Sequence, residues 1–153
     1  MLRPEAFVSS RESLDVHSIY AFEGTIGQGG YGRVVKATHR RLGVQRAIKI
    51  IPKRDNAEGI RNEIRTLCEL HHPHVAKLVE YFEDAGRFYL VQALVDGPDL
   101  AELLGAAVND SGHTLPERQT SILIRDCLRA VAGCHARGFV HRDIKLDNFM
   151  LSS

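Results

Sequence analysis

Apolar and polar residues alternate with a period of two in several short stretches of the first 93 residues. Such alternation sends successive side chains to opposite faces of a sheet, so it predicts β-strands. The stretches are residues 20–39, which hold two strands around a glycine-rich turn, and residues 45–51, 77–82 and 87–93. Residues 83–86 form a turn that makes the last two stretches a hairpin. The pattern therefore predicts a sheet of five strands.

A helix is predicted over residues 60–70, where Ile60, Ile64 and Leu67 are spaced to form one apolar stripe. Residues 1–19 are different, because they are rich in serine, arginine and glutamate and group few apolar positions. We interpret them as a polar leader without a core of its own, and we assign them no function.

Beyond the sheet the spacing of apolar residues is helical. Residues 100–104 predict a short helix, and the small, polar residues 105–114 predict a surface loop. A longer helix then begins with Thr114 as its N-cap and Pro116 in its first turn, and it ends before Gly138. Its inner face is expected to carry Leu123, Cys127, Ala130, Val131 and Cys134.

The turn between the first two strands, residues 27–34, reads G-x-G-x-x-G-x-V. Glycine has no Cβ, so backbone N–H groups can approach phosphate oxygens closely, and Tyr31 could fold over them as a lid. A dinucleotide-binding turn has the same glycine spacing, but it opens a helix. Here the β-branched Val34 and Val35 follow, which favours a hairpin. A merely flexible hairpin would also fit the motif alone.

Lys49 and Glu63 are charged residues at positions where the pattern predicts apolar surroundings. Lys49 lies within the strand Ala-Ile-Lys-Ile-Ile, and Glu63 falls inside the apolar stripe of the first helix. Because an unpaired buried carboxylate is costly, we expect Glu63 to face inward and to pair with Lys49. Two alternatives stay open: a Lys49 side chain that extends to solvent, and a partly exposed Glu63 that pairs with Arg61 or Arg65.

A polar loop lies between the apolar residues 139–140 and 149–151. A loop held at both ends by buried residues can keep an acid, a base and an amide at fixed separations. The alternative is an ordinary charged turn between two core segments. Its polar residues are His141, Arg142, Asp143, Lys145, Asp147 and Asn148.

The loop contains His-Arg-Asp followed, after four intervening residues, by Asn, and this pattern resembles the catalytic loop of eukaryotic protein kinases. The glycine turn and the Ala-Ile-Lys strand resemble two further kinase motifs. Lys145 is typical of serine/threonine kinases, and the loop is most similar to calcium/calmodulin-dependent and calcium-dependent kinases. The resemblance implies an α+β fold. It would comprise an antiparallel N-lobe sheet with helix C (residues 20–91), a hinge (92–99) and the first helices and catalytic loop of a helical C-lobe (100–153).

The resemblance also implies ATP and Mg²⁺ as cofactors and a protein with a serine or threonine acceptor as the partner. Asp143 would accept the hydroxyl proton, Lys145 would contact the γ-phosphate and Asn148 would bind Mg²⁺. Lys49, held by Glu63, would contact the α- and β-phosphates. The positions that match the nucleotide pocket are Ile26, Gly27, Gln28, Gly29, Gly30, Tyr31, Gly32, Val34, Ala47, Lys49, Gln92, Ala93, Val95, Asp99 and Met150.

The predicted hinge departs from the family pattern at three positions. Ala93 stands where most relatives carry an acid, Pro98 stands where most carry glycine, and Gln92 is an uncommon gatekeeper. Backbone contacts to adenine survive a change of side chain. The contact between Asp99 and the ribose is less secure, because Pro98 stiffens the chain beside it.

No Asp-Phe-Gly, whose aspartate holds the principal Mg²⁺ in the family, occurs among the 153 residues. We therefore expect a fragment of a kinase that transfers phosphate poorly or not at all. A catalytically inactive nucleotide-binding pseudokinase, acting as a scaffold, is the main alternative. A small-molecule kinase is a third, although Arg142 and Lys145 weigh against it.

Composition limits the classes of binding partner and the cellular compartment that we expect. With 20 Lys and Arg against 19 Asp and Glu, the net charge is +1, so no bulk attraction to nucleic acid or to an anionic membrane is expected. No apolar run approaches the roughly 18 residues of a spanning helix, and the start has no secretory signal. We expect an intracellular, cytoplasmic chain, with the nucleus left open and no indication of oligomeric state.

Three cysteines, Cys68, Cys127 and Cys134, form no C-x-x-C pair and are expected to be buried thiols. A metal site would have to combine Cys68 with the nearby histidines. It is the less favoured interpretation, because no second ligand cluster completes a tetrahedron. Those histidines are His71, His72 and His74.

Overall fold

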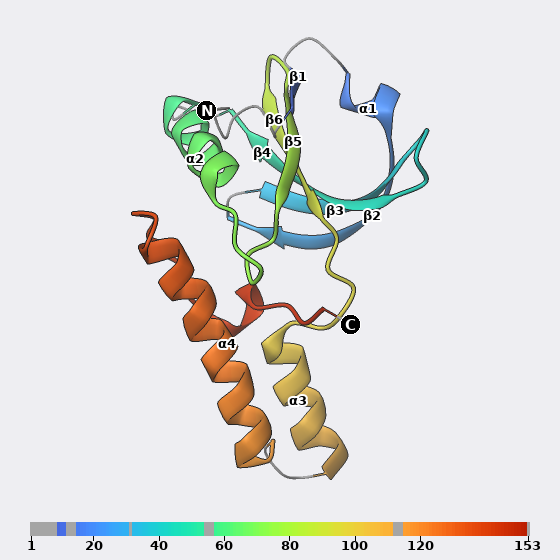
Figure 1. The fold of residues 1–153 in the computed structure, drawn as a ribbon. Helices are drawn as coiled ribbons and strands as arrows, with labels where there is room; N and C mark the ends of the chain where they lie inside the picture. Colours follow the sequence, from blue (N-terminus) through green and yellow to red (C-terminus); the bar gives the residue numbers. More distant parts are fainter. Residues whose placement is uncertain (1–8, 12–14, 31, 54–56, 112–114, 153) are drawn as a thin grey trace. The chain divides into compact units, whose positions relative to one another are not determined.

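A computed structural model describes residues 9–11, 15–30, 32–53, 57–111 and 115–152 (Figure 1). The chain divides into two compact units, and each is described by itself. Unit 1 comprises Met1–His71 and Ala76–Leu94, and unit 2 comprises His72–Val75 and Val95–Ser153.

Unit 1 is built on a six-stranded sheet in the order β1-β5-β6-β4-β3-β2. The five antiparallel strands are those that the alternation predicted: β2 (Tyr20–Gly29), β3 (Gly32–His39), β4 (Gln45–Pro52), β5 (Leu78–Glu83) and β6 (Arg87–Ala93). The sequence did not indicate β1 (Ser9–Arg11), which pairs in parallel with β5. A strand of three residues is too short to show an alternation.

The two faces of the sheet carry separate hydrophobic clusters, and β4 contributes to both. Ile48 and Ile50 are fully or almost fully buried in one cluster, together with Tyr20. Ile51 is buried in the other, together with Leu90. Because neighbouring residues of a strand point to opposite faces, this division confirms the predicted alternation of β4.

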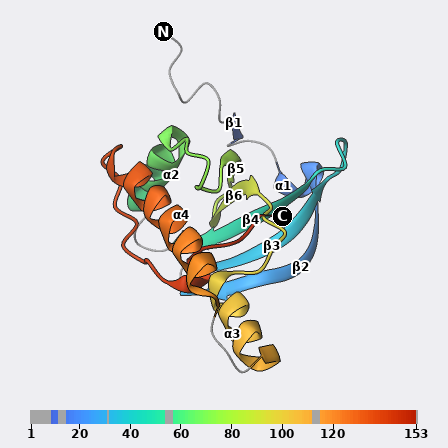
Figure 2. The same ribbon diagram turned by 60° about the horizontal axis from the view of Figure 1, so that its bottom comes forward.

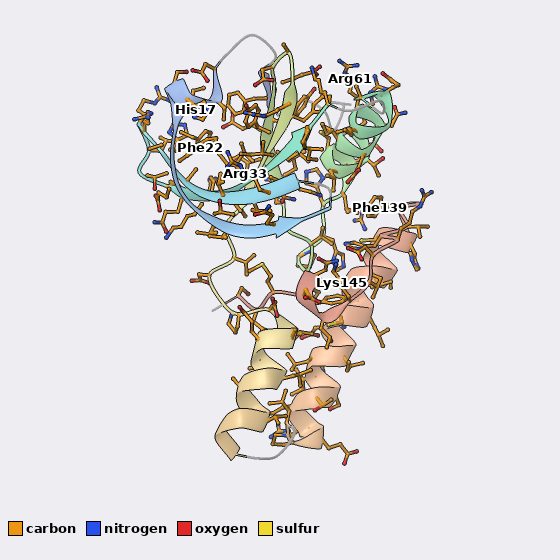
Figure 3. The ribbon with its side chains drawn as sticks, turned by 180° about the vertical axis from the view of Figure 1, so that it is seen from behind. His17, Phe22, Arg33, Arg61, Phe139 and Lys145 are labelled. Atoms are coloured by element: carbon orange, nitrogen blue, oxygen red, sulfur yellow. The ribbon has the colours of Figure 1, made fainter. Side chains whose placement is uncertain are left out.

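The first face is covered by α1 (Val16–Ile19), which lies beside β2 (Figure 1). Val16 is 3% exposed and belongs to the same cluster as Tyr20. The rings of His17 and Phe22 lie 4.3 Å apart between centroids (Figure 3). Asp15 caps the helix, because its Oδ1 accepts a hydrogen bond from the N–H of His17. This part of the predicted leader thus adds to the core of the sheet.

The second face is covered by α2 (Ala57–Glu69) through the buried side chains of Ile64 and Cys68. The helix begins at Ala57, earlier than the predicted start at Ile60. Glu58 lies in the first turn, where a carboxylate interacts favourably with the helix dipole, so these polar residues suit a helix as well as a loop.

Unit 2 contains α3 (Leu100–Ser111), α4 (Glu117–His135) and a short 3₁₀ helix, η2 (Leu146–Asn148), as Figure 2 shows from a second side. Asp99 and Glu102 cap the start of α3 reciprocally. The Glu102 N–H donates to Asp99 Oδ1 over 2.8 Å, and the Asp99 N–H donates to Glu102 Oε2 over 3.2 Å.

The prediction of a loop over residues 105–114 was wrong up to Ser111, because α3 continues that far. A glycine inside a helix costs about 1 kcal/mol relative to alanine, so Gly105 by itself is not enough to end the helix. Ala106 and Ala107, which follow it, are the strongest helix formers. Residues 112–114, including the predicted cap Thr114, lie outside the described residues.

The helix α4 begins at Glu117, so Pro116 occupies its N-cap position rather than its first turn. Ala130 and Cys134 are buried on the predicted inner face. Burial raises the pKa of the Cys134 thiol, and it does the same for Cys127. All three cysteines are free. Cys68 and Cys134 are buried as expected, whereas Cys127 is only partly buried. The raised pKa values of Cys127 and Cys134 disfavour the reactive thiolate.

Two glycines of unit 2 permit close contacts. A Cβ on Gly97 would overlap the Leu151 carbonyl, and a Cβ on Gly133 would overlap the ring of His72. The Leu151 N–H also donates to the Pro98 carbonyl over 3.0 Å. These contacts tie the segment after the polar loop to the start of α3. No helix among the described residues is long and apolar enough to cross a bilayer.

Candidate functional site

The glycine turn joins two antiparallel strands. Gly27 pairs with Val34, Gln28 with Arg33, and Gly29 with Gly32 across β2 and β3. The hairpin prediction is confirmed, and the helix-opening dinucleotide turn is ruled out. Two register shifts precede the turn, and Ile26 lies beside them with its side chain half exposed. Tyr31 lies outside the described residues, so its role as a lid stays a prediction.

The glycines of this turn are required for different reasons. Gly32 has φ +135°, and a Cβ there would overlap the carbonyl of Ile50, so the fold itself requires glycine. At Gly29 and Gly30 a Cβ would meet no atom within 4 Å. Protein packing does not explain these two glycines, whereas the close approach of a ligand would.

Lys49 lies at the centre of a small face formed by three strands. It is opposite Val34 of β3 and opposite Leu90 of β6, and the next position on the same face, Ala47, is opposite Gln92. Side chains directly opposite each other share a face, so four residues predicted to contact ATP lie together here. Their side chains are half-buried. They are Val34, Ala47, Lys49 and Gln92.

Glu63 does not face inward as predicted. Its side chain is exposed on α2, and among the described residues the side chains of Glu63 and Lys49 form no hydrogen bond or ion pair. Ile64 and Cys68 are buried, and Ile60 and Leu67 of the predicted stripe pack against the same cluster, so the stripe is confirmed and Glu63 lies beyond the edge of the buried face.

An arginine of the same helix contacts the end of β5. The Arg61 Nη2 contacts Glu83 Oε1 at 2.5 Å. The sequence predicts Glu83 in a hairpin turn and Arg61 only as an alternative partner of Glu63. Arg61 and Glu83 are 22 residues apart, so no local pattern signals their contact.

The remaining positions predicted to contact the nucleotide lie at the end of β6 and after it. The Ala93 N–H of unit 1 donates to the Lys77 carbonyl over 3.1 Å and is not free for adenine. In unit 2, Val95 is half-buried, and Asp99 forms an isolated antiparallel bridge with Met150. Asp99 already uses Oδ1 to cap α3, which leaves Oδ2 for a ribose.

The polar loop of unit 2 is held by its own side chains. Asn148 donates from Nδ2 to the Asp143 carbonyl over 2.6 Å and to Asp143 Oδ2 over 3.0 Å. The Lys145 ammonium lies 3.3 Å from Asp143 Oδ2 (Figure 3). Arg142 has φ +64°, a left-handed conformation that costs a non-glycine residue energy. The loop thus brings together an acid, an ammonium and an amide, as predicted. The prediction that buried residues hold both of its ends was wrong, because Val140 is 59% and Met150 51% exposed.

The hydrogen bond from Asn148 and then the contact with Lys145 lower the pKa of Asp143 below its ordinary value of 3.8. A lowered pKa in the folded chain favours the carboxylate, which is lost only as the pH falls through that lowered value. We expect Asn148→Ala to raise the pKa of Asp143 towards 3.8, as followed by the ¹³C shift of its carboxyl group. Asp147→Ala is the control, because the Asp147 side chain takes part in none of these contacts, and it should leave the titration unchanged. An unchanged titration in Asn148→Ala would contradict the assigned hydrogen bond.

Mg²⁺ prefers oxygen ligands and usually binds one or two protein groups together with phosphate. Because Asn148 donates through Nδ2, its Oδ1 remains as an acceptor, and it forms no hydrogen bond among the described residues. The donor set therefore fits the ion. Within the described residues no three His, Cys, Asp or Glu side chains are placed to hold a metal on their own.

Comparison with known proteins defines the class of this chain. The protein kinase domain family matches residues 20–153, and the chain belongs to this family. The match covers the five antiparallel strands with their glycine hairpin, Lys49 and the polar loop, and it leaves out β1 and α1.

Among its relatives is calcium-dependent protein kinase 5 of Plasmodium falciparum, which is 35% identical over 145 residues, 94% of this chain and 24% of that kinase. Serine/threonine-protein kinase RAD53 of Saccharomyces cerevisiae is 34% identical over 132 residues, 82% of this chain and 15% of that kinase. The human NUAK family SNF1-like kinase 1 is 34% identical over 137 residues, 86% of this chain and 20% of that kinase. The chain thus spans about a quarter or less of the length of these relatives.

Proposed function

We propose that this chain supplies the nucleotide-binding sheet and the catalytic loop of a kinase that transfers phosphate from ATP to serine or threonine hydroxyl groups of proteins. The observation that carries this proposal is the loop in which Asn148 and Lys145 both contact the carboxylate of Asp143. Family membership and the names of the relatives support the serine/threonine class.

At the loop, Asp143 is the group that orients the acceptor hydroxyl and takes its proton as the new P–O bond forms. Its lowered pKa keeps it a carboxylate at neutral pH, the form that can accept a hydrogen bond. Lys145 lies beside it and would balance negative charge on the γ-phosphate. Mg²⁺, held by Asn148, would neutralise charge on the phosphate oxygens when bound.

In unit 1, Gly29 and Gly30 leave their backbone open to phosphate oxygens, and Lys49 would contact the α- and β-phosphates. Ala47 and Gln92 would face the adenine on the same side of the sheet.

We expect the 153-residue chain to bind ATP through Lys49. Lys49→Met removes a charge-assisted contact, so it should weaken ATP binding about 10- to 100-fold by isothermal titration calorimetry. Lys77→Met, at an exposed position of the same unit, is the control and should leave the affinity unchanged. Equal affinities for wild type and Lys49→Met would contradict the role of Lys49, and no binding by wild type would contradict the nucleotide site.

Phosphate transfer by the 153 residues alone should stay at background, because they contain no Asp-Phe-Gly to supply the principal metal ligand. The measurement is transfer from labelled ATP to a mixed protein substrate, with Asp143→Asn as the control. Transfer that Asp143→Asn abolishes would overturn the expected inactivity and support the catalytic role of Asp143.

A nucleotide-binding scaffold is the second candidate function. The observation that favours it is the exposed Glu63, which leaves Lys49 without the expected partner among the described residues. A scaffold would bind ATP with the same dependence on Lys49, but it would not transfer phosphate even in a product that carries an Asp-Phe-Gly. Reading the transcript past Ser153 and assaying that product separates the two candidates.

A further inference from the structure

Three charged side chains meet where α2 passes the end of β5. Glu83 Oε1 accepts from the Lys53 ammonium at 2.6 Å and from Arg61 Nη2 at 2.5 Å. Lys53 also donates to the Asp84 carbonyl over 2.5 Å. The three residues therefore join α2 to the ends of β4 and β5, and Figure 3 shows Arg61 at this end of the helix.

This cluster is partly removed from water, in contrast to the other ion pairs of the helix. The side chains of Glu83 and Lys53 are 12% and 17% exposed, whereas Glu58, which also pairs with Arg61, is 67% exposed. Both cations lie over the ring of the buried Phe88, Lys53 at 5.0 Å and Arg61 at 5.7 Å from its centroid. The hydrogen bond from Arg61 and the contact with Lys53 lower the pKa of Glu83. The Glu83 carboxylate is thus more shielded from water than a typical surface acid, although the Arg61 side chain is itself 43% exposed.

The cluster lies on the side of α2 opposite to Glu63. Successive residues of an α-helix are turned by about 100°, so Arg61 and Glu63 lie about 200° apart around the axis. A rotation that carried Glu63 towards the sheet and Lys49 would move Arg61 away from Glu83 by the same angle. The Arg61–Glu83 contact and a Lys49–Glu63 contact therefore compete in a rigid helix.

We propose that Glu83 is a positioning residue that, through Arg61, holds α2 in the orientation in which Glu63 faces solvent and stays away from Lys49. Loss of the contact frees the helix to turn, and Glu63 then pairs with Lys49. The rotation matters for the proposed function because it controls the partner of the phosphate-binding lysine.

The test is carbodiimide cross-linking of the nucleotide-free 153-residue chain, which joins an amine to a carboxylate that contacts it. Mass spectrometry then measures the Lys49–Glu63 product. In the wild type this product should be scarce, whereas the Lys53–Glu83 product should form readily. Arg61→Gln breaks the proposed contact but keeps Lys53 and Glu83 as an internal reference. It should raise the Lys49–Glu63 product about tenfold, the effect of losing one charge-assisted hydrogen bond.

Glu83→Gln should raise the product by a similar factor, and the double variant should raise it no further, because both changes remove one contact. Glu58→Gln is the matched control, since it removes only the exposed partner of Arg61 and should change nothing. Circular dichroism melts identify any variant that unfolds. If either Arg61→Gln or Glu83→Gln unfolds, the other variant still tests the same contact.

Unchanged cross-linking in folded Arg61→Gln and Glu83→Gln, or an equal rise in Glu58→Gln, would overturn the proposal. Cross-linking requires neither ATP nor phosphate transfer. A failure of the proposed function would therefore leave this result standing, and a failure here would leave ATP binding untouched.

Discussion

A chain that begins at Tyr20 is expected to be less stable than one that begins at Asp15 by about 2–4 kcal/mol, the contribution of burying one or two aliphatic side chains. Val16 is 3% exposed and packs on the sheet, and the partly buried Ile19 lies against the same cluster. The family match also begins at residue 20. A truncation designed from the family match alone would therefore begin at Tyr20 and would remove α1.

The measurement is urea unfolding followed by circular dichroism, because the chain has no tryptophan to report on its core. Both truncated chains lack β1, so their difference isolates the five residues from Asp15 to Ile19. Val16→Asp in the full chain should reproduce the loss, since it buries a charge without a partner. Equal stabilities of the two truncated chains would show that α1 adds nothing to the core.

Gly32→Ala is expected to lower the free energy of unfolding by about 1–3 kcal/mol from backbone strain alone, and the overlap with the Ile50 carbonyl adds to that. Gly32 is the only one of the turn's glycines among the described residues with a positive φ. The strain falls on the β2–β3 hairpin, so the glycine turn itself is expected to open.

Gly29→Ala is the matched control, because its Cβ would meet no atom within 4 Å. It should leave the unfolding free energy within about 0.5 kcal/mol of wild type. It should nevertheless weaken ATP binding, since the added methyl group would occupy the space proposed for phosphate. Gly32→Ala with wild-type stability would contradict the structural requirement, and Gly29→Ala with wild-type affinity would contradict the proposed phosphate contact.

The strands of unit 1 could be predicted because neighbouring residues in the sequence specify them. The alternation at Ile48, Lys49 and Ile50 needs only neighbouring residues, and the structure places these side chains on the predicted faces of β4. The glycine turn before Val34 and Val35 was correctly predicted as a hairpin for the same reason. The polar loop was equally accessible, since Asp143, Lys145 and Asn148 lie within six positions and their contacts are short-range.

The orientation of α2 could not be predicted in this way. An apolar stripe defines a broad face, and Glu63 lies at the edge of that face, so a modest rotation decides whether it is buried or exposed. That rotation depends on Glu83, which is far from Arg61 in the sequence. The length of α3 was missed for a smaller reason: the reciprocal cap of Asp99 and Glu102 and the two alanines outweigh the single Gly105.

The amino-acid sequence by itself therefore determined the class of this protein, the strands of its sheet, the glycine hairpin and the set of residues in the polar loop, because short-range periodicity and spacing specify each of them. Only the tertiary structure decided that Val16 belongs to the core and that Arg61 pairs with Glu83 while Glu63 faces solvent. Contacts between distant segments depend on how helices and strands pack, and packing is a property of the folded chain as a whole.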